Sequence, residues 1–129
     1  MANRYGEAAI MAAQLGTSGD PDPCIRWENA MNKLYPTSPA ARKKSSPRDA
    51  FLGLCEEGLV KGISAGSYTK PSRNKEYAVR AVTLLTGQTE KLSRSALWQA
   101  VTNDAGKEEN GQIDIVLALW NKGLIIGKP

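Results

Sequence analysis

Histidine is absent from the 129 residues of the sequence. Its absence excludes Ser-His-Asp and Cys-His catalytic sites as they are normally built, and it removes the commonest protein ligand of zinc and iron. The two cysteines, Cys24 and Cys55, are too few for a disulfide framework or for a tetrahedral thiolate site. We expect no metal, no cofactor and two small buried thiols; a disulfide between them is the less favoured alternative.

Long apolar runs are absent as well. No segment approaches the roughly 20 residues that a membrane-spanning helix requires. The N-terminal run 1–13 faintly resembles a signal peptide, but Glu7 interrupts it and its apolar part is short. We therefore expect a cytoplasmic protein that has no membrane partner.

The usual catalytic motifs are missing too. No glycine-rich phosphate loop of the P-loop or dinucleotide type is present. Residues 62–66 match the nucleophile-elbow pattern of α/β hydrolases, but that pattern requires a preceding strand and a histidine base. The carboxylate pairs Glu56-Glu57 and Glu108-Glu109 are adjacent in sequence, and adjacent residues do not face one another on a helix. We expect a non-enzymatic protein without catalytic residues; chemistry by distant carboxylates or a lysine is the remaining alternative.

A stretch of fourteen residues occurs twice in the chain. Residues 49–62 align with residues 114–127, and six of the fourteen positions are identical. The identical pairs are Asp49/Asp114, Leu52/Leu117, Leu54/Leu119, Gly58/Gly123, Leu59/Leu124 and Gly62/Gly127. The repetition predicts two related helices. Convergence is the alternative, because a helix that ends in glycine and an apolar residue is common.

Each stretch predicts a helix with a specified end. Gly58 and Gly123 stand where a chain that leaves a helix takes a positive φ, which glycine adopts without strain. Leu59 and Leu124 follow as the apolar residues that pack back on the helix. The pair Ser46-Pro47 is predicted to begin the first of these helices as a hydroxyl cap and a first-turn proline.

The flanks extend the repetition. Both halves of the chain have the same order of predicted helices. The first helix begins near a tyrosine, the second carries a tryptophan, and the third is the repeated stretch that ends in glycine and leucine. Trp27 and Trp98 are expected to occupy equivalent buried positions. The fold class is therefore all-α, with two tandem three-helix copies, about 4–62 and 75–127, packed into one globular domain of residues 1–129. The six helices are predicted near 4–15, 23–34, 47–57, 74–86, 94–102 and 112–122.

Basic residues concentrate in the middle of the chain. Residues 42–80 carry nine Lys or Arg and four Asp or Glu, so this segment could neutralise phosphates. Major-groove recognition is disfavoured, because a predicted loop at 37–45 is longer than the turn of a helix-turn-helix, and because Glu56 and Glu57 would repel phosphates. A solvated basic loop is the plainer interpretation. The candidate phosphate or nucleic-acid contacts are Arg42, Lys43, Lys44, Arg48, Lys70, Arg73 and Lys75.

Several segments together resemble a family of small bacterial proteins of unknown function. These segments are Arg4–Ala9, Tyr35–Pro39, Ala50–Val60 and Leu117–Trp120. The resemblance implies a bacterial, cytoplasmic, stand-alone protein, and it supplies no catalytic or binding residue. The sequence thus favours a non-enzymatic binding or interaction protein with a protein partner of unknown identity. The alternative is a nucleic-acid-associated protein that uses the basic segment 42–80.

Overall fold

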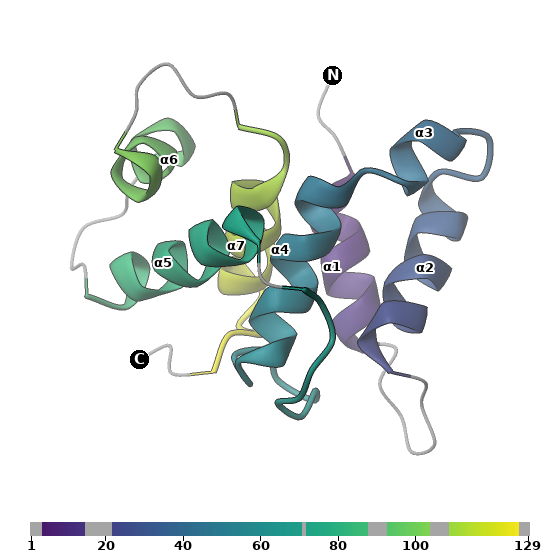
Figure 1. Cartoon of the computed structure of the whole chain (residues 1–129), viewed down its shortest axis with the longest axis horizontal. Helices are drawn as coiled ribbons and strands as arrows, with labels where there is room; N and C mark the ends of the chain where they lie inside the picture. Colours follow the sequence, from purple (N-terminus) through teal and green to yellow (C-terminus); the bar gives the residue numbers. More distant parts are fainter. Residues whose placement is uncertain (1–3, 15–21, 71, 88–92, 104–108, 127–129) are drawn as a thin grey trace.

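The computed structural model describes residues 4–14, 22–70, 72–87, 93–103 and 109–126, and within these ranges it is helical with no strand. Figure 1 shows α4 in the middle of the molecule, with α1 and α2 to one side and α5, α6 and α7 to the other. The predicted all-α class is confirmed. The helices are α1 (Tyr5–Gln14), α2 (Pro23–Leu34), α3 (Pro39–Arg42), α4 (Ser45–Glu56), α5 (Arg73–Gly87), α6 (Arg94–Thr102) and α7 (Gln112–Asn121).

Helices α2 and α6 each begin with a side-chain cap. A carboxylate oxygen of Asp22 accepts hydrogen bonds from the amides of Cys24 and Ile25, at 2.9 and 3.2 Å, and Pro23 follows as the first residue of α2. The hydroxyl of Ser93 accepts from the amide of Ala96 at 3.1 Å and caps α6. These caps satisfy amides that have no partner within the helix.

The segment between α2 and α4 differs from the prediction in two ways. Residues 37–45 were predicted to be a loop, but they contain the short helix α3, which begins with Pro39 and is capped by the hydroxyl of Ser38 at 3.3 Å from the amide of Ala41. Ser46 was predicted to cap α4, but α4 begins at Ser45 and has no side-chain cap. Ser38-Pro39 and Ser46-Pro47 both have the serine-proline pattern that is typical of a helix start. The sequence alone therefore does not show which of the two serines caps a helix.

The two Gly-Leu endings have the same geometry. Gly58 and Gly123 have φ values of 73° and 76°, as the repeated stretch predicts. Each glycine amide donates to the carbonyl three residues earlier, at 3.0 and 3.1 Å, and each following leucine amide donates to the carbonyl five residues earlier, at 3.0 and 2.9 Å. This is the double hydrogen bond of a Schellman end. Gly62 also has a positive φ; Gly127, its aligned residue, lies outside the described residues.

The two endings contact each other. Val60 and Ile125, both buried, form an isolated antiparallel bridge. The amide of Lys61 donates to the carbonyl of Leu124 at 2.8 Å, and the amide of Ile126 donates to the carbonyl of Leu59 at 2.8 Å. The ends of α4 and α7 are therefore joined by reciprocal hydrogen bonds, between segments that lie far apart in the sequence.

The hydrophobic core continues across the whole helical assembly. Phe51, Leu52 and Leu54 of α4 are fully buried, and α4 packs against α2, α5 and α7. Helix α1 contributes mainly alanines to the core and packs against α2 and α7. Small side chains permit this close approach: a methyl group added at Gly6 would lie 2.8 Å from the Cβ atom of Ala118 on α7. No described helix is both long and apolar enough to cross a membrane.

Trp27 and Trp98 are both buried, with 1% and 6% of their surface exposed. Their aromatic neighbours differ. Trp27 stacks on Phe51 of α4 with ring centroids 5.3 Å apart, whereas Trp98 meets Tyr77 of α5 edge-on at 5.1 Å. Val116 is the residue aligned with Phe51 in the second stretch, so no ring is available there for Trp98 to stack on. The two tryptophans share their burial but not their surroundings.

Candidate binding pocket

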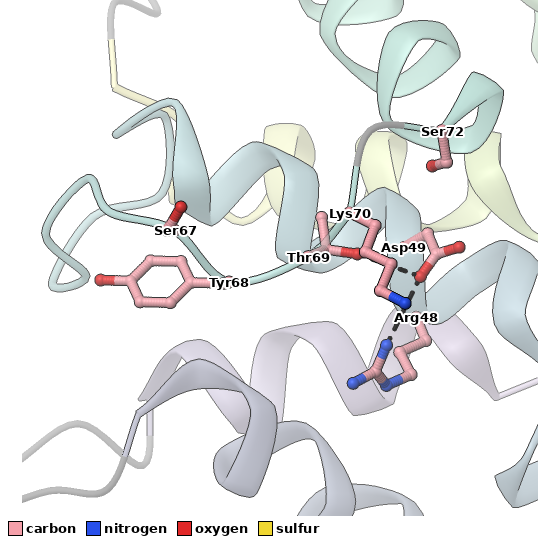
Figure 2. Close-up of a pocket in the computed structure, with 7 residues that line it drawn as sticks. All are labelled: Arg48, Asp49, Ser67, Tyr68, Thr69, Lys70 and Ser72. Carbon is pink, nitrogen blue, oxygen red and sulfur yellow. Dashed lines mark hydrogen bonds and ion pairs between the residues drawn. The ribbon is translucent and has the colours of Figure 1, made fainter.

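A cavity of about 580 Å³ lies between the N-terminal half of α4 and the segment that leads into α5 (Figure 2). We call this cavity the Arg48–Lys70 pocket. Its volume is in the range of small-molecule binding sites. It is lined by Arg48, Asp49, Ser67, Tyr68, Thr69, Lys70 and Ser72.

Glu56, at the end of α4, holds the segment 67–70 in place. One of its carboxylate oxygens accepts hydrogen bonds from the amides of Tyr68 and Thr69, at 2.8 and 3.2 Å, and the other forms an ion pair with Lys75 of α5. The hydrogen bond from Lys75, together with those two amides, lowers the pKa of Glu56 to about 2. Glu56 thus connects α4, the pocket segment and α5 through one ionised group.

Tyr68 is fixed from two further sides. Its carbonyl accepts a hydrogen bond from the thiol of Cys24 on α2 at 3.2 Å, and its phenol donates to the carbonyl of Ser64 at 2.6 Å. Burial raises the pKa of the Cys24 thiol, which keeps the thiol protonated and able to donate. In Figure 2 the ring of Tyr68 points away from Arg48 and Lys70. The backbone of Tyr68 therefore forms the wall of the pocket while its ring anchors the segment.

The charges of the pocket are two cations and one carboxylate. Asp49 Oδ1 lies 3.5 Å from Arg48 Nη1 and accepts a hydrogen bond from the Thr69 hydroxyl at 3.3 Å. Among the described residues, nothing binds the ammonium group of Lys70 or the second oxygen of Asp49. Ser72 caps α5 through the amide of Lys75 at 3.2 Å, so the positive end of the α5 dipole lies at the rim. The lining has a net charge of +1 and favours an anionic group.

Of the seven basic residues predicted to contact phosphate, the structure brings Arg48 and Lys70 together in this pocket. Three others have partners within the protein. Arg42 donates to the carbonyls of Tyr35 and Pro36 at 2.7 and 3.0 Å, Lys44 lies 5.7 Å from the ring centre of Tyr5, and Lys75 pairs with Glu56 and Glu57. Lys43 and Arg73 are exposed and do not line the pocket.

The sequence prediction did not identify the polar residues that complete the pocket. It named Asp49 only as a member of the repeated stretch and assigned no role to Ser67, Thr69 or Ser72. Their convergence depends on Glu56 accepting hydrogen bonds from amides 12 and 13 residues further along the chain. A local pattern does not carry that information. The one available signal was the repetition of Asp49 at position 114, which marks the aspartate as more than an ordinary surface charge.

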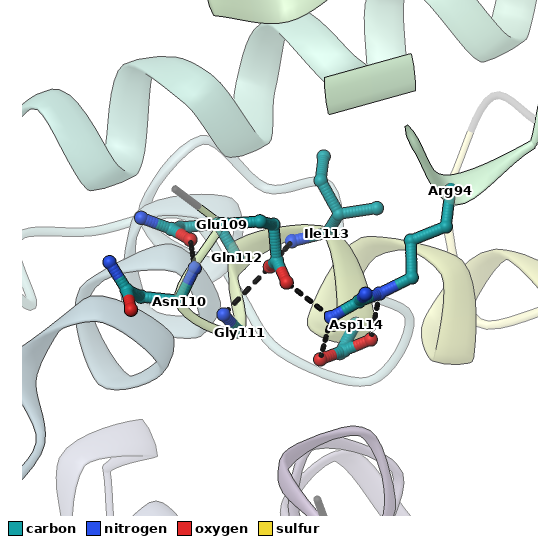
Figure 3. A network of polar contacts seen from close by, with 7 residues as sticks. All are labelled: Arg94, Glu109, Asn110, Gly111, Gln112, Ile113 and Asp114. Carbon is teal, nitrogen blue, oxygen red and sulfur yellow. Dashed lines mark hydrogen bonds and ion pairs between the residues drawn. The ribbon is translucent and has the colours of Figure 1, made fainter. Parts of the chain in front are cut away.

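A second polar network joins α6 to the start of α7 (Figure 3). Arg94 donates to both carboxylate oxygens of Asp114, at 2.7 and 3.0 Å, and also pairs with Glu109. The other oxygen of Glu109 accepts from the amides of Gly111 and Ile113 at 2.7 and 2.9 Å, which caps the first turn of α7. These carboxylates are committed to holding helices together. No cluster of three potential metal ligands exists in the described part of the chain.

A more apolar hollow of about 350 Å³ lies on the outer side of α1, lined by Glu7, Ile10, Met11 and Gln14. These residues recur at the spacing of one helix face. Nothing in the structure identifies an occupant, so the predicted protein partner stays a prediction.

The comparisons with known proteins identify a family, and that family is described as having no known function. The model of a family described as "Family of unknown function (DUF6979)" matches residues 2–126. No curated protein and no solved structure matches the chain. The predicted resemblance to an uncharacterised family is confirmed, whereas a bacterial origin stays a prediction.

Proposed function

The chain belongs to this family of unknown function, and we propose that it is a non-enzymatic binding protein that recognises an anionic group through the Arg48–Lys70 pocket. The observation that carries the proposal is the convergence of Arg48 and Lys70 on one cavity. Hydrogen bonds between a cationic side chain and an anion are stronger than neutral ones. An anion at this position would give Lys70 a partner that the described residues do not provide.

A small acidic ligand fits the charge of the pocket better than a nucleic acid does. Affinity for nucleic acid grows with the number of phosphates that Lys and Arg neutralise. The pocket offers a net charge of +1, and Lys75, another predicted phosphate contact, is already paired with Glu56 and Glu57. Outside the pocket, the nucleic-acid alternative would use the exposed Lys43, Lys44 and Arg73 on the protein surface.

The proposal is tested by titrating the protein with phosphate and acetate at constant ionic strength and following binding by calorimetry. Lys70→Gln and Arg48→Gln should each weaken anion binding about tenfold or more, because each removes one charge-assisted hydrogen bond. Lys122→Gln is the matched control, because Lys122 is exposed and lies outside the pocket. Equal affinity in all four proteins would overturn the proposal. If only DNA or RNA binds, with an affinity that falls steeply with salt, the nucleic-acid alternative replaces it.

We also propose that the fold consists of two related three-helix copies, in which α1, α2 and α4 correspond to α5, α6 and α7. Two observations support this proposal. The helix ends at Gly58 and Gly123 have the same hydrogen bonds, and the bridge between them is reciprocal: Lys61 donates to Leu124 as the aligned Ile126 donates to Leu59. Such reciprocity is what a two-fold axis between equivalent segments produces. Superposing the two halves of a crystal structure tests it; a different helix order or handedness would contradict it.

A further part of the proposal is the cellular location of the protein. We place the protein in the cytoplasm, where thiols stay reduced. Cys24 and Cys55 are both free thiols in this structure.

A further inference from the structure

We propose that the Arg48–Lys70 pocket also contains a cation-binding position at Asp49, and that its ligand is a small zwitterion with a primary ammonium group and a carboxylate or phosphate group. This inference rests on the proposed function, because it requires the anion-binding position at Arg48 and Lys70. It goes further by assigning the chemical class of the ligand.

Asp49 is a carboxylate with unused hydrogen-bonding capacity. An ionised carboxylate can accept about four hydrogen bonds. Asp49 has one at 3.3 Å from Thr69 and a contact of 3.5 Å with Arg48, and both involve Oδ1. These distances are longer than the usual 2.7–2.9 Å or so of a charge-assisted hydrogen bond. The side chain is 18% exposed and lines the pocket, so a ligand can reach it.

Arg48 cannot neutralise Asp49 in the way that a facing arginine would. The two residues are neighbours in α4, and consecutive helix residues point in different directions. Asp114, the aligned carboxylate in the second stretch, shows the contrasting case. It faces Arg94 from α6 and binds that guanidinium through both oxygens, at 2.7 and 3.0 Å. Within the described residues, no cation faces Asp49 from another element in this manner.

A zwitterion matches the charges of the pocket better than an ion of either sign alone. A simple anion near Arg48 and Lys70 is repelled by Asp49, and a simple amine near Asp49 is repelled by the two cations. A ligand with both groups avoids each repulsion by placing its ammonium group at Asp49 and its acidic group at Lys70. The hydroxyls of Thr69 and Ser72, which also line the pocket, can accept or donate further hydrogen bonds.

The test is calorimetric titration of the full-length protein with a series of ω-amino acids: glycine, β-alanine, 4-aminobutanoate and 6-aminohexanoate. Butyrate and butylamine are the matched single-charge ligands. At least one member of the series should bind about tenfold more tightly than butyrate, because it gains a charge-assisted hydrogen bond to Asp49. The length that binds best measures the separation of the two positions.

Asp49→Asn isolates the cation-binding position. This substitution should abolish the preference for the amino acid over butyrate, while affinity for butyrate stays the same or rises because the repulsion is removed. Glu76→Gln, an exposed carboxylate outside the pocket, is the control and should leave the preference unchanged. Thermal unfolding checks that each variant is folded, and the ligand comparison in the unmodified protein does not depend on any variant.

The outcomes separate this inference from the proposed function. If butyrate binds as tightly as every amino acid in the series, the zwitterion inference is wrong and the anion-binding proposal stands. If butylamine alone binds, and Asp49→Asn abolishes its binding, both are wrong. If none of the six ligands and neither inorganic phosphate nor acetate binds at millimolar concentration, both are also wrong.

Discussion

At the scale of single residues, the two glycines that end α4 and α7 have the same conformation but different surroundings. A methyl group added at Gly58 would lie 3.2 Å from the Cβ atom of Ala65, whereas at Gly123 nothing lies within 4 Å. A contact of 3.2 Å requires the neighbour to move. The repeated sequence predicts equal roles for the two glycines, and the structure shows that only their backbone roles are equal.

Alanine substitutions at the two glycines should therefore differ in cost. Gly123→Ala should lower the free energy of unfolding by about 1–2 kcal/mol, because alanine must adopt a positive φ. Gly58→Ala should cost more, because the contact with Ala65 adds to the same backbone strain. Urea denaturation of both variants measures the difference. A greater loss at Gly123 than at Gly58 would contradict this reading, and Gly87→Ala, which meets nothing within 4 Å and has no positive φ, is the control.

At the scale of elements, the connection between α4 and α5 depends on the ionisation of Glu56. The pKa of this carboxyl falls from an ordinary 4.5 to about 2, mainly through Lys75 and then through the amides of Thr69 and Tyr68. Because the folded pKa is the lower one, the interaction contributes stability above about pH 4.5, and that contribution is lost as the pH falls from 4.5 through 2. The segment that forms the pocket wall should hence stay attached to α4 in mild acid.

The titration of Glu56 can be followed through its hydrogen-bond donors. The amide proton shifts of Tyr68 and Thr69, measured by NMR between pH 7 and pH 1.5, should change with a midpoint near 2. Lys75→Gln should move that midpoint toward 4.5, because it removes the largest cause of the shift. Glu57→Gln is the control: it removes the neighbouring carboxylate of the same lysine and leaves both amides bonded to Glu56. A midpoint near 4.5 in the unmodified protein would show that Glu56 does not hold the segment.

The elements themselves were largely predictable, and the pocket was not. The helix ends at Gly58 and Gly123 follow from local rules, as do the caps at Asp22 and Ser93, because each depends on residues within one or two turns. The pocket depends on Glu56 reaching residues 68 and 69, on Cys24 reaching Tyr68, and on the position of α5. These contacts span 12 to 44 residues of sequence, so no local pattern specifies them. Helix α3 was missed for a different reason, since one short turn has no apolar periodicity to detect.

At the scale of the whole molecule, the contacts between helices of the two halves are more extensive than those within either half. Helix α4 packs against α5 and α7, and α1 packs against α7. The bridge between Val60 and Ile125 joins the halves again at the ends of α4 and α7. Separating the halves would expose the alanine face of α1 and the apolar face of α4 to water. Neither half has a core that it completes alone.

The chain should consequently unfold in one cooperative transition. Trp27 reports on the first half, and Trp98 with Trp120 reports on the second. Two variants separate the signals: one keeps only Trp27, and the other carries Trp27→Phe. For each variant, the midpoint of urea unfolding measured by fluorescence should coincide with the midpoint measured by circular dichroism. Phenylalanine in place of Trp27 keeps the stacking on Phe51 and limits the loss of stability to the part due to side-chain size. If the fluorescence of either variant changed at a urea concentration at which its helical signal did not, the halves would unfold separately. The contacts of α4 with α5 and α7 would then contribute less to stability than their burial indicates.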